Sequence, residues 1–176
     1  MGSVIALFVA GIVGLAVYSS STEDSTGVTA FADWDLPVLD DETDLDGRVL
    51  LTEFGDKPVV VNFFASWCTI CEDELPTFRD AADSLTDEVE FVFVNTNETG
   101  NWRPMAERTG ILEQVIVKDI GGTQRNGLYR SLGGTGGMPM TAYYSADGEL
   151  LSIDRGGVSR EALSDRLQRF FGVVWI

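Results

Sequence analysis

The sequence predicts an α/β fold in which helices flank a central mixed β-sheet. Residues 59–64 form a continuous apolar run, which is typical of a strand buried on both faces of a sheet. Strand and helix patterns alternate after this run, and such alternation favours parallel strands. Nearer the C-terminus, two strand patterns flank an Asp-Gly pair, which indicates an antiparallel hairpin. Parallel strands followed by a hairpin together predict the mixed sheet.

A β-rich N-terminal extension is expected before this sheet. Residues 31–39 suggest an extended segment, and Pro37 would keep it at an edge because proline cannot donate to a β-ladder. Residues 40–46 form an acidic turn, and residues 48–52 return either as the second strand of a hairpin or as a strand followed by a turn. The buried strand 59–64 then follows.

In the middle of the chain, apolar residues at helical spacing alternate with the apolar runs typical of strands. A helix is predicted over 68–85, from apolar residues at helical spacing: Leu75, Phe78, Ala81, Ala82 and Leu85. Residues 89–95 form the next strand. A helix from residue 101 or 102 to 109 would be stopped by Gly110, and a short strand covers 115–117. Residues 123–132 predict a weak helix, because Gly127 lies inside it.

The C-terminal part predicts a hairpin and a closing helix. Strands at 141–145 and 149–153 flank a turn with Asp147-Gly148 at its tip. The last helix would begin after Ser159 as N-cap and end at Gly172 as C-cap. The apolar tail 173–176 is expected either to pack on the domain or to mark a trimmed C-terminus.

Charge and composition limit the function. The chain has 176 residues, of which 44% are hydrophobic, so it can form one domain with a real core and a short appendage. The net charge of −16 comes from 28 acidic and 12 basic residues. This acidic balance argues against nucleic acid as a partner, because little basic surface could neutralise phosphates. The acidic surface fits either ordinary solubility or a habitat of high salt.

The first residues differ from the rest. Residues 1–20 form a hydrophobic segment, and residues 21–30 a polar linker rich in Ser, Thr and acids. A membrane-spanning helix needs about 20 apolar residues, so this segment predicts a membrane anchor, with a cleaved signal or a buried helix as alternatives. Either of the first two would place the domain, residues 31–176, outside the cytoplasm.

The motif Trp67-Cys68-Thr69-Ile70-Cys71 holds both cysteines of the chain and follows the buried strand. Cys68 would lie at a helix N-terminus, where free N–H groups and the helix dipole favour a thiolate. Cys71 is one turn away and could close a disulfide. A zinc site is disfavoured because the chain lacks histidine and further cysteines. A structural disulfide and two unrelated buried cysteines are the remaining alternatives to a redox-active dithiol, and no metal or cofactor is expected.

Three stretches resemble one family. Residues 55–76, GDKPVVVNFFASWCTICEDELP, are similar to the thioredoxin-like proteins of the TlpA/ResA type. Residues 137–141, GMPMT, resemble the cis-proline loop of that superfamily, and Asp147-Gly148 its hairpin turn. The resemblance covers about residues 31–171. It implies a thioredoxin fold and a membrane-anchored thiol–disulfide oxidoreductase outside the cytoplasm.

The resemblance also implies roles for five residues. Cys68 would be the attacking thiol and Cys71 the resolving thiol. Pro139 would be preceded by a cis peptide bond and would face the dithiol, with an ordinary trans proline as the alternative. The backbone of Met138 would pair with the substrate chain. Trp67 would flank the dithiol and shape the docking surface, unless it serves only in packing.

Glu74 matches a carboxylate that lies near the dithiol in ResA-like proteins. One helical turn beyond Cys71, it could approach that sulfur and exchange the proton of the resolving thiol. The alternative is a solvated helix glutamate. Thioredoxin itself has a buried aspartate where this chain has Asn62, which increases the importance of Glu74. Glu72 and Asp73 follow the motif, and their negative charge would disfavour a thiolate at Cys68.

The leading functional hypothesis is an anchored reductase of disulfides in extracytoplasmic client proteins, for example in cytochrome c maturation. Its partners would be clients with disulfides or dithiols, a membrane electron donor of the dithiol type, and the membrane itself through the N-terminal segment. Two alternatives remain: an oxidase or isomerase that introduces disulfides, and a redox-inert binding domain that uses the cis-proline groove.

Overall fold

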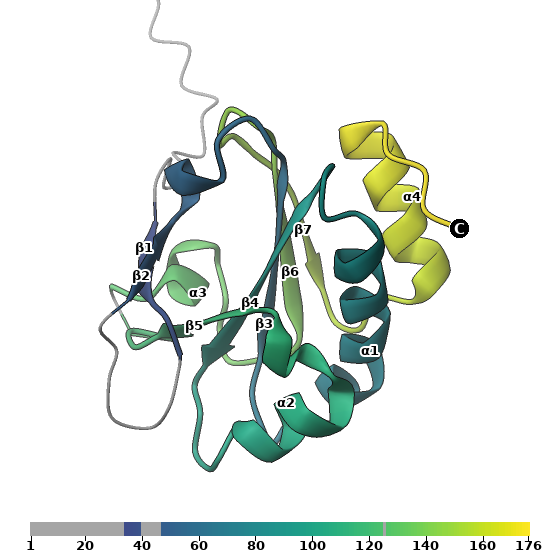
Figure 1. The fold of residues 1–176 in the computed structure, drawn as a ribbon. Coiled ribbons are helices and arrows are strands. Elements are labelled where there is room, and N and C mark those ends of the chain that lie inside the picture. The colour runs from purple at the N-terminus through teal and green to yellow at the C-terminus, as the bar shows by residue number, and fades with distance from the viewer. Residues whose placement is uncertain (1–33, 40–46, 125) are drawn as a thin grey trace, which may run out of the picture.

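A computed structural model describes residues 34–39, 47–124 and 126–176. Its centre is a five-stranded sheet in the order β5-β4-β3-β6-β7 (Figure 1). The strands are β3 (Val59–Phe64), β4 (Glu90–Thr96), β5 (Val115–Asp119), β6 (Met140–Tyr144) and β7 (Leu150–Arg155). β3 pairs parallel with β4, and β4 with β5, whereas β6 runs antiparallel to both β3 and β7. The predicted mixed sheet is therefore confirmed.

Helices cover both faces of this sheet. The α-helices are α1 (Thr69–Ser84), α2 (Arg103–Thr109), α3 (Leu128–Ser131) and α4 (Arg160–Phe171), with 3-10 turns η1 (Leu51–Phe54) and η2 (Ile111–Glu113). In Figure 1, α1 and α4 lie on one side of the sheet, and α3 lies with the N-terminal strands on the other. Two buried apolar clusters match these two layers. All six residues of β3 are buried between them, as the apolar run predicts.

The N-terminal β extension lies beside β5, at one edge of the sheet. β1 (Asp35–Pro37) pairs antiparallel with β2 (Arg48–Leu50). Val38 then forms a β-bridge to Val117 of β5. Edge strands expose unpaired backbone groups, so this contact protects the outer edge of β5. The position of Pro37 at a sheet edge agrees with the sequence.

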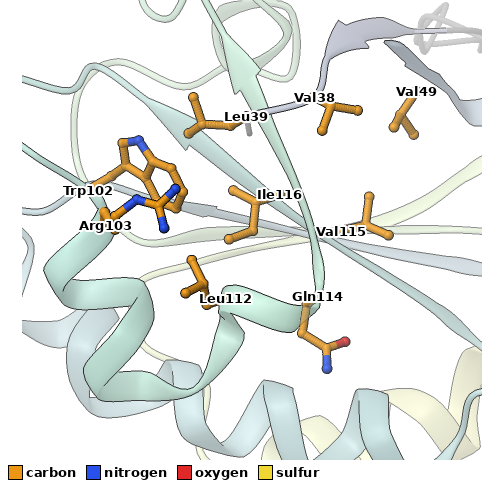
Figure 2. Close-up of a pocket in the computed structure, with 9 residues that line it drawn as sticks. All are labelled: Val38, Leu39, Val49, Trp102, Arg103, Leu112, Gln114, Val115 and Ile116. Atoms are coloured by element: carbon orange, nitrogen blue, oxygen red, sulfur yellow. The ribbon is translucent and has the colours of Figure 1, made fainter. Parts of the chain in front are cut away.

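A cavity of about 400 Å³ lies where this extension meets α2 and η2 (Figure 2). Leu39 contributes from the extension, Trp102 and Leu112 from the helical side, and Ile116 from β5. Neither cysteine lines it. The cavity is therefore separate from the candidate redox site.

Local sequence rules set the ends of two helices. Cys68 is the N-cap of α1, which continues through Pro76. For α4, the Ser159 hydroxyl accepts a hydrogen bond from the backbone N–H of Ala162, and Gly172 takes a left-handed conformation with φ 72°. The tail beyond Gly172 packs on the domain, because Val173 and Trp175 are buried.

The helix predicted over 123–132 is wrong in its extent, since only Leu128–Ser131 is helical. The buried carboxylate of Asp119 sets where this helix begins, because it accepts from the backbone N–H groups of Leu128 (3.2 Å) and Tyr129 (2.9 Å), the first two residues of α3, and from that of Gly122 (3.1 Å). These bonds fold the preceding segment into a loop around the carboxylate. The loop brings backbones so close that a Cβ on Gly127 would lie 2.1 Å from the carbonyl oxygen of Gly122.

Some expectations fall outside the described residues. The hydrophobic segment 1–20, the linker 21–30 and the acidic turn 40–46 are among them. Within the described ranges, every helix is too short or too polar to cross a membrane.

The substitution Asp119→Ala should destabilise the domain by about 3 kcal/mol, because it leaves three backbone N–H groups without their acceptor in a buried site. Chemical denaturation of the full chain measures this loss. Asp87→Ala, at an exposed turn residue, is the matched control and should change stability by less than about 0.5 kcal/mol. Equal effects of the two substitutions would contradict the role given to Asp119.

Candidate active site

The two cysteines lie where β3 leads into α1. They form a disulfide with a Cα–Cα separation of 5.2 Å. The backbone N–H of Cys71, in the first turn of α1, points at Cys68 Sγ at 3.1 Å. Cys68 is 5% exposed and Cys71 fully buried, so Cys68 offers the more accessible sulfur of the pair. This geometry fits an attacking thiol at Cys68 and a resolving thiol at Cys71.

The peptide bond between Met138 and Pro139 is cis, as expected from the resemblance. The carbonyl oxygen of Pro139 accepts a hydrogen bond from the N–H of Gly156 at 3.0 Å, which ties the loop to the end of β7. Met138 lies just before β6, and its partly buried side chain packs against the apolar cluster that contains both cysteines. Met138 thus packs against the same apolar cluster to which both cysteines belong.

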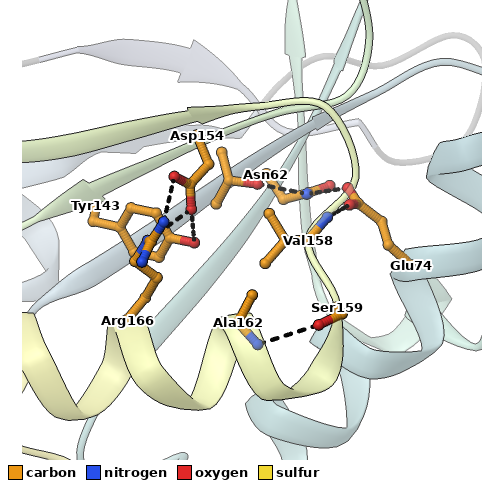
Figure 3. Close-up of polar contacts among 9 residues, drawn as sticks. Asn62, Glu74, Tyr143, Asp154, Val158, Ser159, Ala162 and Arg166 are labelled. Carbon is orange, nitrogen blue, oxygen red and sulfur yellow. Dashed lines mark hydrogen bonds and ion pairs between the residues drawn. The ribbon is translucent and has the colours of Figure 1, made fainter.

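The carboxyl group of Glu74 is buried, with the residue 5% exposed, so its interpretation as a solvated helix glutamate is wrong. It accepts hydrogen bonds from Asn62 Nδ2 and from the backbone N–H of Val158, both at 2.8 Å (Figure 3). Desolvation raises its pKa and the two hydrogen bonds lower it, which leaves the pKa at about 7. A general acid or base works best with a pKa near the working pH.

Asn62 has a role that the sequence did not suggest. Its side-chain amide donates to Glu74 and also to the hydroxyl of Thr141, at 3.1 Å. It therefore connects α1 to β6 through β3. Although Asn62 cannot accept a proton as an aspartate would, it holds in place the carboxyl group that can.

A surface cleft of about 220 Å³ reaches Glu74. Its walls come from α1, through Ile70 and Thr77, and from the segment before α4, through Gly157 and Val158. The buried carboxyl group therefore has a short route to solvent. A proton taken from the dithiol could leave by this route.

Two large apolar side chains flank the dithiol and face solvent. Trp67 is 46% exposed and Ile70 is 51% exposed. The indole N–H of Trp67 donates to the carbonyl oxygen of Asn97 at 3.0 Å, which fixes the ring on the surface. Such exposure does not fit simple core packing for Trp67. The two side chains instead offer an apolar surface beside the cysteines.

The negative charge that follows the motif is partly balanced. The guanidinium of Arg108, on α2, donates to the Glu72 carboxylate at 2.7 Å. This hydrogen bond raises the pKa of Arg108. Asp73 stays exposed on α1. The charge that opposes a thiolate at Cys68 is thus smaller than the sequence alone indicates.

Glu98 is a supporting residue that the sequence interpretation missed. Its carboxylate accepts from the N–H and hydroxyl of Ser66, at 2.8 and 2.5 Å, and from Asn95 Nδ2 at 2.9 Å. Backbone N–H groups of Thr99 and Gly100 also donate to it. Partial burial alone raises its pKa, but these hydrogen bonds dominate and lower the pKa to about 2.

The position of Glu98 explains its effect on the site. Ser66 lies two residues before Cys68, so the ionised carboxylate fixes the backbone that leads into the dithiol. The sequence contains a feature that could have indicated this role of Glu98. Polar residues follow β4, and the carboxyl ends of neighbouring parallel strands meet at one edge of a sheet.

Among the described residues, no group of three or more Cys, Asp or Glu side chains is arranged to hold a metal ion.

Comparison with known proteins agrees with this geometry. Residues 28–142 match the family model described as AhpC/TSA family. Over 171 residues the chain is 27% identical to thiol-disulfide oxidoreductase ResA of Geobacillus thermodenitrificans, covering 96% of this chain and 93% of that protein. Thiol-disulfide oxidoreductase ResA of Oceanobacillus iheyensis is 27% identical over 169 residues, with 94% and 84% covered.

Solved structures are similar in fold. A putative thiol:disulfide interchange protein DsbE from Chlorobium tepidum matches with a TM-score of 0.63 at 23% identity, covering 78% of this chain and 92% of that one. The exposed lipoprotein thioredoxin Etrx1 from Streptococcus pneumoniae matches with a TM-score of 0.62 at 22% identity, covering 78% and 99%. The chain has the thioredoxin fold.

The interactions of Glu98 predict a pH dependence of stability. Because folding lowers its pKa from 4.5 to about 2, the ionised carboxylate stabilises the domain above pH 4.5, and this contribution is lost as the pH falls toward 2. Glu98→Gln should therefore be less stable than the parent at neutral pH, by an amount that shrinks over that interval. Thermal unfolding from pH 7 to 2.5 measures it.

The exposed substitution Glu88→Gln is the control and should follow the parent at every pH. A stability difference between Glu98→Gln and the parent that stays constant from neutral to acid pH would contradict the assignment.

Proposed function

The chain belongs to the AhpC/TSA family and is a thiol–disulfide oxidoreductase, and from this premise we propose that it reduces disulfide bonds in client proteins outside the cytoplasm. One observation carries the proposal. The two cysteines of the chain form a disulfide at the N-terminus of α1 and share their neighbourhood with a cis-proline loop and a buried carboxyl group whose pKa is about 7.

The proposed cycle uses both sulfurs. In the reduced protein, the Cys68 thiolate attacks one sulfur of the client disulfide and forms a mixed disulfide, while the other client sulfur leaves as a thiolate. Cys71 then loses its proton and attacks Cys68 Sγ. This step restores the Cys68–Cys71 disulfide and releases the client as a dithiol. Two electrons have passed to the client, and a membrane donor of the dithiol type returns them.

Glu74 supplies the proton step in this proposal. Its hydrogen bonds in the structure go to Asn62 and Val158 rather than to a sulfur. It lies one helical turn beyond Cys71, and its pKa of about 7 leaves a large share of it ionised at neutral pH. The ionised form takes the proton of Cys71 as that thiol attacks the mixed disulfide. The cleft beside Glu74 then returns the proton to solvent.

The surface around the dithiol suits a protein client. Exposed Trp67 and Ile70 offer apolar contact, and the backbone of Met138 would pair with the client chain. The resemblance of residues 55–76 to the TlpA/ResA type supports a location outside the cytoplasm and apocytochrome c, in its disulfide form, as a client. The hydrophobic segment 1–20 would anchor the chain, with a signal cleaved from a secreted protein as the alternative.

Replacement of the resolving thiol tests the cycle. The variant Cys71→Ser should accumulate mixed disulfides through Cys68, seen as reducible adducts on a non-reducing gel. Cys68→Ser is the control and should trap none. The parent should reduce the disulfides of insulin. A redox-inert binding domain would show neither adducts nor reduction.

The direction of electron flow requires the reduction potential of the pair, measured by equilibration with glutathione. A reductase should have a value near about −270 mV, and a value near about −120 mV would instead identify the oxidase alternative.

The proton step predicts a pH profile. In the parent, the rate at which Cys71 resolves a preformed mixed disulfide should rise through an inflection near pH 7, as Glu74 ionises. Glu74→Gln should lose this inflection and slow the step by about 10-fold or more at pH 7. Stopped-flow release of a fluorescent client thiol measures both. The neighbouring exposed substitution Asp73→Asn should keep the inflection. An unchanged profile in Glu74→Gln would remove Glu74 from the mechanism.

A further inference from the structure

A second cleft, of about 310 Å³, is lined in part by the loop that leads to the cis proline. Its lining includes Tyr129 of α3, Thr135, Gly137 and Met138 of the loop, and Arg155 at the end of β7. It shares no lining residue with the cleft that reaches Glu74. The proposed proton step therefore makes no use of it.

The cleft is held open by the glycines and tyrosine around it. A Cβ placed on Gly137, or on the neighbouring Gly156, would meet no other atom within 4 Å, so the missing side chains leave empty space. The Tyr129 hydroxyl accepts from the N–H of Gly136 at 3.2 Å and donates to the carbonyl oxygen of Gly137. These bonds fix the loop. The space is thus preorganised to receive atoms from another molecule.

Arg155 is an exposed base at the rim of this cleft, and it has no carboxylate partner within the described chain. Its one hydrogen bond there runs from Nη2 to the carbonyl oxygen of Leu132, at 3.0 Å. Most other bases of the described part pair with acids: Arg48, Lys57, Arg79, Arg108, Arg160 and Arg166. A guanidinium has five N–H donors in a fork that matches a carboxylate. Arg155 therefore has N–H donors available to bind a carboxylate.

The cleft adjoins the cis-proline loop, where a client chain is proposed to pair. Met138 lines it and packs against the apolar cluster that contains both cysteines. Gly156, which follows Arg155 in the sequence and also lines the cleft, donates its backbone N–H to the carbonyl oxygen of Pro139. A client chain paired with the backbone of Met138 would advance about 3.3 Å for each residue. Arg155 is the register partner of Met140, two residues beyond Met138, so we expect client residues one to three positions from the attacked cysteine to lie within its reach.

We propose that this cleft, called here the Arg155 subsite, binds an acidic side chain of the client within three residues of the disulfide under attack. The inference rests on the proposed function, because it assigns that site a preference among protein clients. Arg155 acts through charge and geometry on the bound client and takes no part in electron transfer. The −16 net charge of the chain makes such a local base important, since the rest of the surface repels acidic clients.

Matched peptides test the subsite. Two synthetic peptides with the same internal disulfide carry either Glu or Gln two residues after the second cysteine, and the reduced full chain acts on each. We expect kcat/KM to be about fivefold higher for the Glu peptide at low salt, because an exposed charge pair contributes up to about 1 kcal/mol. In Arg155→Gln the ratio of the two rates should fall to one or below, because the remaining negative charge disfavours the Glu peptide. High salt should reduce the ratio in the parent.

Arg169→Gln, which removes an exposed arginine from α4 and the same formal charge, is the control and should keep the parent ratio. A ratio of one in the parent, or a ratio unchanged by Arg155→Gln, overturns the proposal. For a third peptide with Lys at that position, Arg155→Gln should raise the rate relative to the Glu peptide, and the absence of such a change would also overturn the subsite.

A binding measurement separates this inference from the proposed function. Calorimetry with the oxidised full chain and linear peptides, in which serine replaces both client cysteines, reports the subsite without any redox step. The Glu peptide should bind the parent more tightly than the Gln peptide, and Arg155→Gln should abolish the difference. Failure of every disulfide peptide to be reduced would refute the reductase, whereas equal binding of the two linear peptides would refute the subsite.

Discussion

The arrangement around the dithiol depends on one buried carboxyl group. Glu74 belongs to α1, which also carries the cysteines, and its two donors come from β3 and from the segment before α4. One side chain therefore fixes three parts of the fold against each other. Burial of this acid is costly, and the two hydrogen bonds offset only part of the cost, so its pKa settles at about 7. The contact that organises the site also gives it a group that exchanges protons at neutral pH.

Two carboxyl groups near the motif have opposite properties for one physical reason. Glu98 receives hydrogen bonds from five donors and has a pKa of about 2, whereas Glu74 receives two in a more buried place and has a pKa of about 7. The number of donors decides whether hydrogen bonding outweighs desolvation. Glu98 thus remains ionised and serves as a fixed acceptor for the segment before Cys68. Glu74 changes its protonation state, so the proton chemistry falls to it.

Sequence rules succeeded where short-range physics decides the outcome. The apolar run of β3, the turn at Asp147-Gly148 and the caps Ser159 and Gly172 follow from neighbours a few residues away. The thioredoxin fold and the cis bond at Pro139 followed from family resemblance. Contacts between distant residues were not predictable: Val158 donates to Glu74 across 84 positions, and Asp119 accepts from the first two N–H groups of α3 and so sets where that helix begins. In both cases the partner lies far away in the sequence, where local patterns give no indication of it.

The acidity of Cys68 also depends on a distant partner, and this matters for redox direction. The N–H of Cys71 points at Cys68 Sγ and favours a thiolate, while Glu72 and Asp73 oppose it. Arg108 of α2 pairs with Glu72 and weakens that opposition. A more stable thiolate favours the reduced protein and makes the disulfide more oxidising. The pairing of α2 with α1 therefore acts against strong reducing power, and the balance between Arg108 and the acids that follow Cys71 helps to set the potential at which the protein works.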